Sequence, residues 1–112
     1  MLITSVDSQP VAESLARNIV RQRLAACVQV SASVTSAYHW EDHMESAEEY
    51  SLSIKTTVEK LDETIAWLHQ HHPYEVPELI WWPVHASDGY AGWVNESVQS
   101  VRSLNRDEGD DH

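Results

Sequence analysis

Two segments of this chain alternate apolar and polar side chains with a period of two, the pattern of a strand that buries one face. The first runs from Cys27 to Trp40, and the second runs from Tyr50 to Ile54. Between them, residues 41–46 (EDHMES) are polar enough for a turn, although they lack the glycine that makes a tight turn easy. The alternation therefore predicts two half-buried strands joined in a hairpin.

A helical period precedes this hairpin. The stretch DSQP at 7–10 predicts a helix start, because Ser8 or Asp7 can cap and Pro10 is tolerated in a first turn. The helix is expected to end near Leu24. Its apolar residues fall at helical spacing: Val11, Ala12, Leu15, Ala16, Ile19 and Val20.

A second helical period follows the hairpin. Thr56 and Glu59 have the spacing of a capping box, in which Thr56 caps the helix and Glu59 reaches back to it. The helix must end before Pro73, since a residue that precedes proline is pushed out of the helical region. The expected apolar stripe consists of Val58, Leu61, Ile65 and Leu68.

The remaining apolar runs complete the order of elements. Residues 1–6 (MLITSV) and 79–84 (LIWWPV) are predicted strands, and Pro83 indicates a strand end or a sheet edge. A last helix is expected to begin at Ser87 or Asp88. The order β-α-β-β-α-β, with an extra C-terminal helix, predicts an α+β, ferredoxin-like domain.

Length and charge limit the classes of protein. The 112 residues fit one domain, which we place at 1–101, followed by an acidic, disordered tail at 102–112. The net charge is −11, with only seven Lys and Arg, so we expect no nucleic-acid partner and no binding to an anionic membrane surface. No apolar run approaches the ~18 residues of a membrane span.

The single cysteine, Cys27, excludes an internal disulfide and fits a reducing compartment. No signal peptide is visible at the N-terminus. A cytoplasmic location is therefore expected.

Five short stretches in fixed order resemble one family. They are LAACVQV, TSAYHWED, EEYSLSIKTT, HHPYEVPEL and YAGWVNESV. Together they are similar to the CutA family of divalent-cation tolerance proteins over about Leu2 to Val101. The resemblance implies a ferredoxin-like homotrimer in which long strands pack between subunits, an architecture similar to that of PII-type signalling proteins.

The resemblance also implies a function. Members of this family are described as binding copper or other divalent cations, with a first-strand cysteine and paired histidines as candidate ligands. The histidines correspond to His71 and His72, but the cysteine position falls at Thr4, a poor copper ligand. Asp42 stands where a glycine usually follows Trp-Glu.

Each candidate site residue also has a structural interpretation. One of His71 and His72 can cap a helix C-terminus instead of binding metal. Cys27 can be a buried apolar residue or a thiol ligand. Tyr74 and Glu75 can form an acid–base pair or lock the turn between two prolines. Of the remaining histidines, His39 and His43 flank the hairpin and can form a two-histidine site or remain solvated.

An intersubunit cleft of such a trimer is the second candidate location for a metal ion or small ligand. We expect it to be lined by Cys27, Tyr38, Trp40, Tyr74 and Glu75. The chain has no Gly-rich phosphate loop, no serine-nucleophile elbow and no HExxH motif, so we predict that it is not an enzyme. The alternatives to cation tolerance are a PII-like small-molecule sensing module and a purely structural trimeric scaffold.

Overall fold

The computed structural model describes residues 1–31 and 33–99. The predicted acidic tail at 102–112 lies outside the described residues. The elements, in chain order, are β1 (Leu2–Val6), α1 (Gln9–Arg21), β2 (Cys27–Val30), β3 (Val34–Trp40), β4 (His43–Lys55), α2 (Val58–His71), β5 (Ile80–Trp81) and α3 (Asp88–Ser97).

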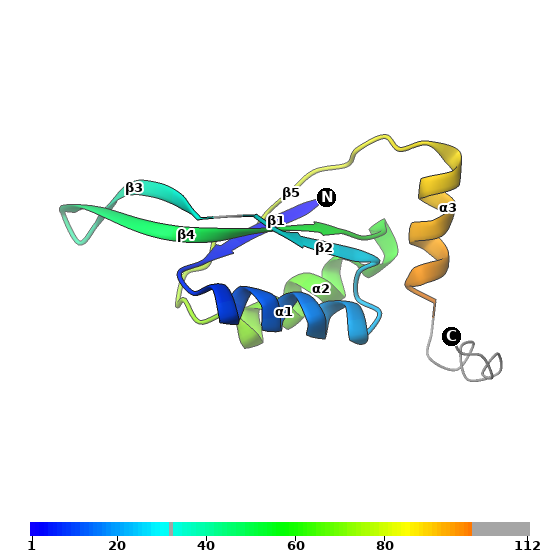
Figure 1. Cartoon of the computed structure of the whole chain (residues 1–112), viewed down its shortest axis with the longest axis horizontal. Helices are drawn as coiled ribbons and strands as arrows, with labels where there is room; N and C mark the ends of the chain where they lie inside the picture. Colours follow the sequence, from blue (N-terminus) through cyan, green and yellow to red (C-terminus); the bar gives the residue numbers. More distant parts are fainter. Residues whose placement is uncertain (32, 100–112) are drawn as a thin grey trace.

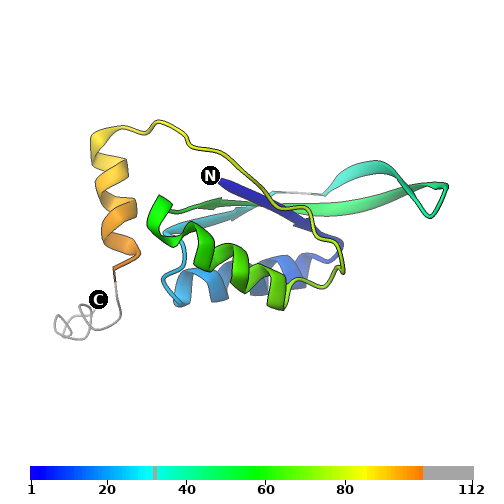
Figure 2. The ribbon, with the colours of Figure 1, turned by 180° about the vertical axis from the view of Figure 1, so that it is seen from behind.

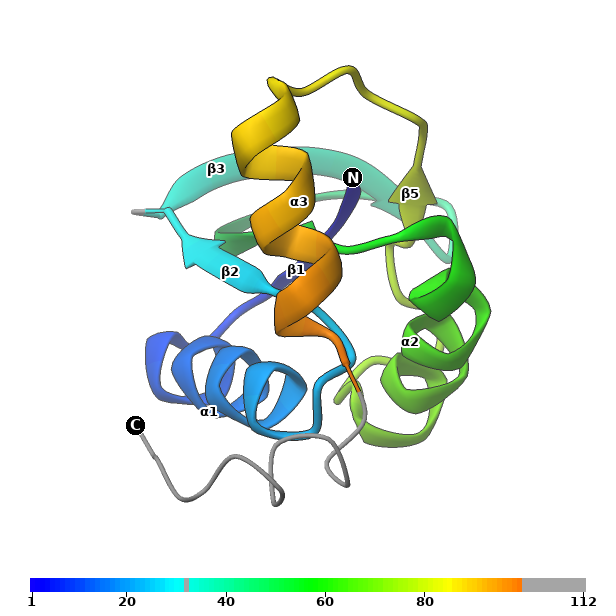
Figure 3. The ribbon, with the colours of Figure 1, turned by 90° about the vertical axis from the view of Figure 1, so that its right-hand side faces the viewer.

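The strands form one antiparallel sheet in the order β2-β4-β1-β5, and β3 pairs with the other half of β4. Helices α1 and α2 lie side by side and cover one face of this sheet (Figures 1 and 3). The β3–β4 hairpin extends beyond the helices at one end, and α3 stands at the other (Figure 1). The predicted α+β, ferredoxin-like fold with an extra C-terminal helix is therefore confirmed.

The single strand expected over residues 27–40 is divided into β2 and β3. Val30 pairs with Leu52 and Val34 pairs with Glu49, so the chain advances four residues while β4 advances three. One extra residue on one strand turns the side chains that follow it to the opposite face. Val34 is accordingly 48% exposed, while Val30 packs against the core. The prediction of one unbroken alternation was wrong here.

The turn of the hairpin consists of only Glu41 and Asp42. Trp40 pairs directly with His43, and the two turn residues have φ values of 52° and 68°. Two consecutive positive φ angles are typical of a type I′ turn, whose twist matches that of the strands. Neither position is glycine, so both side chains are held in the left-handed region that L-residues adopt at a cost.

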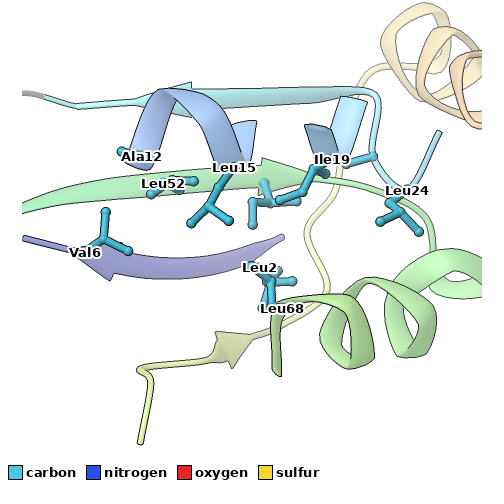
Figure 4. Close-up of a cluster of buried hydrophobic side chains, with 10 residues drawn as sticks. Leu2, Val6, Ala12, Leu15, Ile19, Leu24, Leu52 and Leu68 are labelled. Carbon is cyan, nitrogen blue, oxygen red and sulfur yellow. The ribbon is translucent and has the colours of Figure 1, made fainter. Parts of the chain in front are cut away.

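The apolar core lies between the sheet and the two covering helices (Figure 4). The predicted stripe of α1 is confirmed at Ala12, Leu15 and Ile19, which are buried, but Val20 is 38% exposed. The stripe of α2 is confirmed at Leu68, but Val58 is 83% exposed. The most deeply buried members of the core are Leu2, Val6, Ala12, Ile19, Leu52, Ile54 and Leu68.

Two helix boundaries differ from the prediction. Helix α1 ends at Arg21 instead of near Leu24, because Arg23 adopts φ 62° and reverses the chain. Helix α2 is capped by Thr57, whose Oγ1 accepts the N–H of Lys60 at 3.3 Å. Thr56, the expected cap, instead donates its hydroxyl to the Leu24 carbonyl at 2.6 Å. The predicted capping box of Thr56 and Glu59 was therefore wrong: the cap lies one residue later, and the residue three positions after it is Lys60, which cannot reach back as an acceptor.

Helix α3 begins where the sequence predicted, with Ser87 accepting the N–H of Tyr90. The predicted strand before it is shorter than expected, because only Ile80 and Trp81 pair with β1. The chain then crosses to the far end of the sheet before α3 begins (Figure 2). At the other end of α3, Arg23 donates to the Ser97 carbonyl at 2.9 Å and ties the helix to the α1–β2 connection.

The turn predicts the effect of one substitution. Asp42→Gly should raise the free energy of unfolding by roughly 0.5–1 kcal/mol, because glycine adopts positive φ without a Cβ penalty. The change can be measured by urea denaturation. Asp42→Ala is the control: it removes the same carboxylate without relieving the backbone, so it should give no gain. An equal gain in both variants would show that charge, and not backbone conformation, limits this turn.

Candidate functional site

His72 ends α2 and lies almost buried, at 8% exposure, between the helix and the sheet. Its Nδ1 accepts the backbone N–H of Tyr74 at 3.1 Å. Its Nε2 lies 3.0 Å from both the Thr4 hydroxyl and the Ser5 carbonyl. Because Nδ1 acts as an acceptor, these contacts assign the proton to Nε2, which donates to the Ser5 carbonyl. The neutral ring thus uses both of its nitrogen atoms.

The surroundings of His72 also favour the neutral ring. Burial lowers its pKa below the ordinary value of 6.5. The hydrogen bond to Ser5 and the charge of Glu49 act in the opposite direction, and nearby His69 adds to the lowering. The net shift is downward, so the ring stays unprotonated at neutral pH.

His71 points elsewhere and is exposed. Its Nδ1 lies 2.9 Å from the carbonyl of Trp67, to which it can donate a hydrogen bond. Its ring stacks on the indole of Trp67, with 4.1 Å between ring centroids and 17° between planes. This contact with a carbonyl near the end of α2 agrees with the interpretation of His71 as a helix-end group.

The residues that the family resemblance names for copper are partly brought together. Thr4 and His72 are in contact, so the first-strand position and one histidine do meet. Their donors do not fit copper, however, because a threonine hydroxyl is a poor ligand and both nitrogens of His72 are occupied. Within residues 1–31 and 33–99 no group of three or more His, Cys, Asp or Glu is placed to hold a metal ion.

The opposite face of the sheet holds a second polar cluster, centred on Glu49 of β4. This carboxylate is only 9% exposed. It accepts hydrogen bonds from Tyr74 at 2.8 Å, from Ser36 at 2.9 Å and from Ser5 at 3.4 Å. The Ser5 hydroxyl also lies 3.2 Å from a carboxylate oxygen of Glu78. The loop that follows α2 is thereby fastened to three strands.

Tyr74 acts in this cluster as a hydrogen-bond donor. Burial raises the pKa of its phenol well above the usual range, and the hydrogen bond and charge of Glu49 raise it further. Smaller contributions to the same increase come from Asp7 and Tyr38. A phenol that keeps its proton is a poor general base, so the cluster favours binding over acid–base chemistry.

This cluster forms one wall of a pocket of about 700 Å³ at the foot of the hairpin, which we call the hairpin pocket. It brings together four of the five residues predicted for a cleft: Tyr38, Trp40, Tyr74 and Glu75. The fifth, Cys27, pairs with Lys55 at the other end of β4 and does not line this pocket.

Sequence reasoning missed the carboxylate at the centre of the site. Glu49 shares one face of β4 with Glu45, because alternate residues of a strand point the same way. This is the face opposite to that of Leu52 and Ile54, so the pattern held a signal for an acidic side of the strand. The same alternation separates His39 from His43: since Trp40 pairs with His43, these two histidines lie on opposite faces and do not form the suggested pair.

A second hollow, of about 930 Å³, lies between α3, the start of α2 and the segment after β5. We call it the α3 hollow. Its walls include large apolar side chains that are exposed, among them Val58, Trp81, Trp82, Val84 and Tyr90. Exposed apolar side chains therefore gather around this hollow.

Residues 1–97 match the sequence family described as CutA1 divalent ion tolerance protein. The chain belongs to this family. The divalent-cation tolerance protein CutA of Salmonella newport is 34% identical over 100 residues, which cover 88% of this chain and 87% of the relative. No helix among the described residues of this family member is long and apolar enough to cross a membrane.

Solved CutA structures share the fold. CutA from Synechococcus elongatus PCC7942 superposes with a TM-score of 0.83 at 36% identity, covering 88% of each chain. A protein from Archaeoglobus fulgidus, described as a periplasmic divalent cation tolerance protein CutA, has a TM-score of 0.83 at 27% identity. That alignment covers 88% of this chain and 96% of the relative.

The environment of His72 predicts how stability depends on pH. The folded-state pKa lies below the unfolded value of 6.5, so the unfolded chain binds more protons as the pH falls past 6.5. The free energy of unfolding should therefore decrease from about pH 7.5 to about pH 5, in the range where histidine titrates. Urea denaturation at several pH values measures this slope.

Two variants isolate the contribution of His72. His72→Gln should flatten the slope below pH 6.5, at the expense of stability at neutral pH. His85→Gln, which changes an exposed histidine in the loop before α3, should leave the slope unchanged. An undiminished slope in His72→Gln would contradict the assignment.

Proposed function

We propose that this CutA1 family member acts in divalent-cation tolerance as a homotrimer with PII-like architecture. The observation that carries the proposal is that apolar surface is exposed at both ends of the subunit. At one end, the hairpin presents Trp40 at 48% and Met44 at 77% exposure. At the other end lies the α3 hollow, with Trp81 at 48% exposure.

Two different apolar surfaces at opposite ends of the subunit favour a head-to-tail contact. When the rotation between subunits closes, such heterologous contacts generate a ring. The hairpin also has open backbone edges, since β3 and the outer half of β4 pair only with each other in the described chain. Unpaired edges of this kind promote contact with another chain. Both features support the trimer that the family resemblance implies.

Light scattering tests the trimer. The wild-type protein is expected to have three times the mass of one chain at micromolar concentration. Met44→Glu at the hairpin end and Trp81→Glu at the α3 hollow should each yield smaller species, because a charge would be buried in the contact. Val20→Glu, at an exposed apolar residue of α1, is the control and should remain trimeric. A monomeric wild-type protein would refute the proposal.

Copper binding at His71 and His72 stays a prediction of the family resemblance. The geometry favours structural roles for both, because His72 has no free nitrogen and His71 faces away from it. A divalent cation that supports tolerance would then be bound elsewhere, or through residues of more than one subunit. The net charge of −11 favours cations in either case.

Copper titration of the tag-free trimer decides between these interpretations. On the geometry described above, the double variant His71→Ala/His72→Ala should bind copper with the same affinity as the wild type. A loss of affinity of about tenfold, or about 1.4 kcal/mol, would instead support the pair as ligands. Unfolding of the double variant must be monitored in parallel, because it removes the contacts of His72 to β1.

A second candidate function is small-molecule sensing. It is favoured by one observation, the hairpin pocket, where Tyr38, Trp40, Tyr74 and Glu75 meet. Its volume lies in the range of about 300–1,000 Å³ that is typical of small-molecule sites. Like the leading proposal, this function consists of binding without catalysis, and it is compatible with the cytoplasmic location expected for a chain with one cysteine.

A further inference from the structure

We propose that the hairpin pocket binds a small organic cation, such as a quaternary or primary ammonium compound. The inference builds on the second candidate function by naming the class of ligand. It requires neither copper nor the two histidines at the end of α2. His72 lies on the helix-covered side of the sheet, and His71 is exposed on the helix itself.

The charge of the pocket is the first argument. Five carboxylates line it, and no Lys, Arg or His does; the carboxylates are those of Asp7, Glu45, Glu49, Glu75 and Glu78. Among the described residues, the ion pair that the structure contains joins Lys60 and Glu63 on α2, away from the pocket. The negative charge of the pocket is therefore not balanced by side chains of its own subunit.

The burial of Glu49 makes the unbalanced negative charge of the pocket energetically unfavourable. Its carboxylate is nine-tenths buried, yet its hydrogen-bond partners are three neutral hydroxyl groups. One of these, the hydroxyl of Ser5, has a single proton but lies within reach of both Glu49 and Glu78. Two carboxylates therefore compete for one donor. A buried charge is stabilised by an opposite charge, and a bound cation would provide it.

Aromatic rings make up much of the remaining wall. Tyr38 and Trp40 are 43% and 48% exposed, and they follow each other on the same face of β3. Tyr38 pairs directly with Glu45, which places an aromatic ring beside a carboxylate. Ammonium groups are attracted both to carboxylates and to the faces of such rings, and aromatic cages are the usual receptors for quaternary ammonium.

The same features argue against a metal ion as the occupant. Calcium and magnesium require six or more oxygen ligands around one point, but the described residues contain no convergent group of three or more acidic or histidine ligands. A pocket of about 700 Å³ is also far larger than one ion needs. An organic cation matches both the volume and the mixed acidic and aromatic wall.

Choline and its neutral isostere 3,3-dimethylbutan-1-ol provide the test, because they have the same shape and differ in charge. Calorimetric titration of the tag-free protein, in the oligomeric state in which it is purified, should show saturable binding of choline. The neutral isostere should bind at least about tenfold more weakly. Equal binding of the two probes, or no saturable binding of choline, would overturn the proposal.

Variants locate the site on β4. Glu49→Gln and Glu45→Gln should each weaken choline binding by about three- to tenfold, since each removes one negative charge from the wall. Glu45 is exposed, so its variant remains informative if Glu49→Gln fails to fold. Glu48→Gln is the matched control, because Glu48 lies between them on β4 and points to the opposite face. An equal loss in all three variants would indicate general charge attraction and would also overturn the proposal.

Two further measurements separate this inference from the proposed function. Light scattering on the same samples reports the trimer independently of choline. Titration with Mg²⁺ and Cu²⁺ reports metal binding: a metal that displaces choline and loses affinity in Glu49→Gln would make the pocket a metal site and overturn the organic-cation proposal. A trimer that fails to bind choline would refute only the inference, whereas a choline-binding monomer would refute only the trimer.

Discussion

The imidazole ring of His72 is the contact on which the rest of this structure depends. It lies at the end of α2, and it joins Thr4 and Ser5 of β1 to the backbone of Tyr74. A single neutral ring thus fixes where the helix ends, how the helix sits on the sheet and where the next loop starts. Because both nitrogen atoms are used, neither protonation nor metal binding is possible without breaking one of these contacts.

This contact has consequences on the other side of the sheet. The loop that starts at His72 carries Tyr74 to Glu49, two groups that are far apart in the sequence. The sheet consequently separates two kinds of chemistry. The layer between the sheet and helices α1 and α2 is mostly apolar, with Thr4, Thr64 and His72 as buried polar residues, whereas the opposite face at the foot of the hairpin is acidic and aromatic. The proposed cation recognition belongs to the second face, where the side chains of Tyr38 and Trp40 are exposed.

Much of the fold could be predicted from local pattern. The order of elements, the buried residues of α1 and the start of α3 at Ser87 all follow from periodicity and capping, which involve residues close in sequence. The division of the strand over 27–40 could not be predicted, because the extra residue is visible only once β2 and β3 are paired with β4. The cap of α2 was misplaced for a similar reason: Thr56 and Thr57 are chemically alike, and the distant Leu24 carbonyl takes the first of them.

By itself, the sequence determined the order of helices and strands, the family and the acidic character of the chain, because these depend on periodicity, short motifs and composition. It also placed Tyr38, Trp40, Tyr74 and Glu75 together as candidates. Only the tertiary structure decided that Glu49 lies at their centre, that Cys27 lies apart from them within one subunit, and that His71 and His72 diverge. The physical reason is strand register: one residue more or less reverses the face to which every following side chain points, and the pairing of distant strands sets that count.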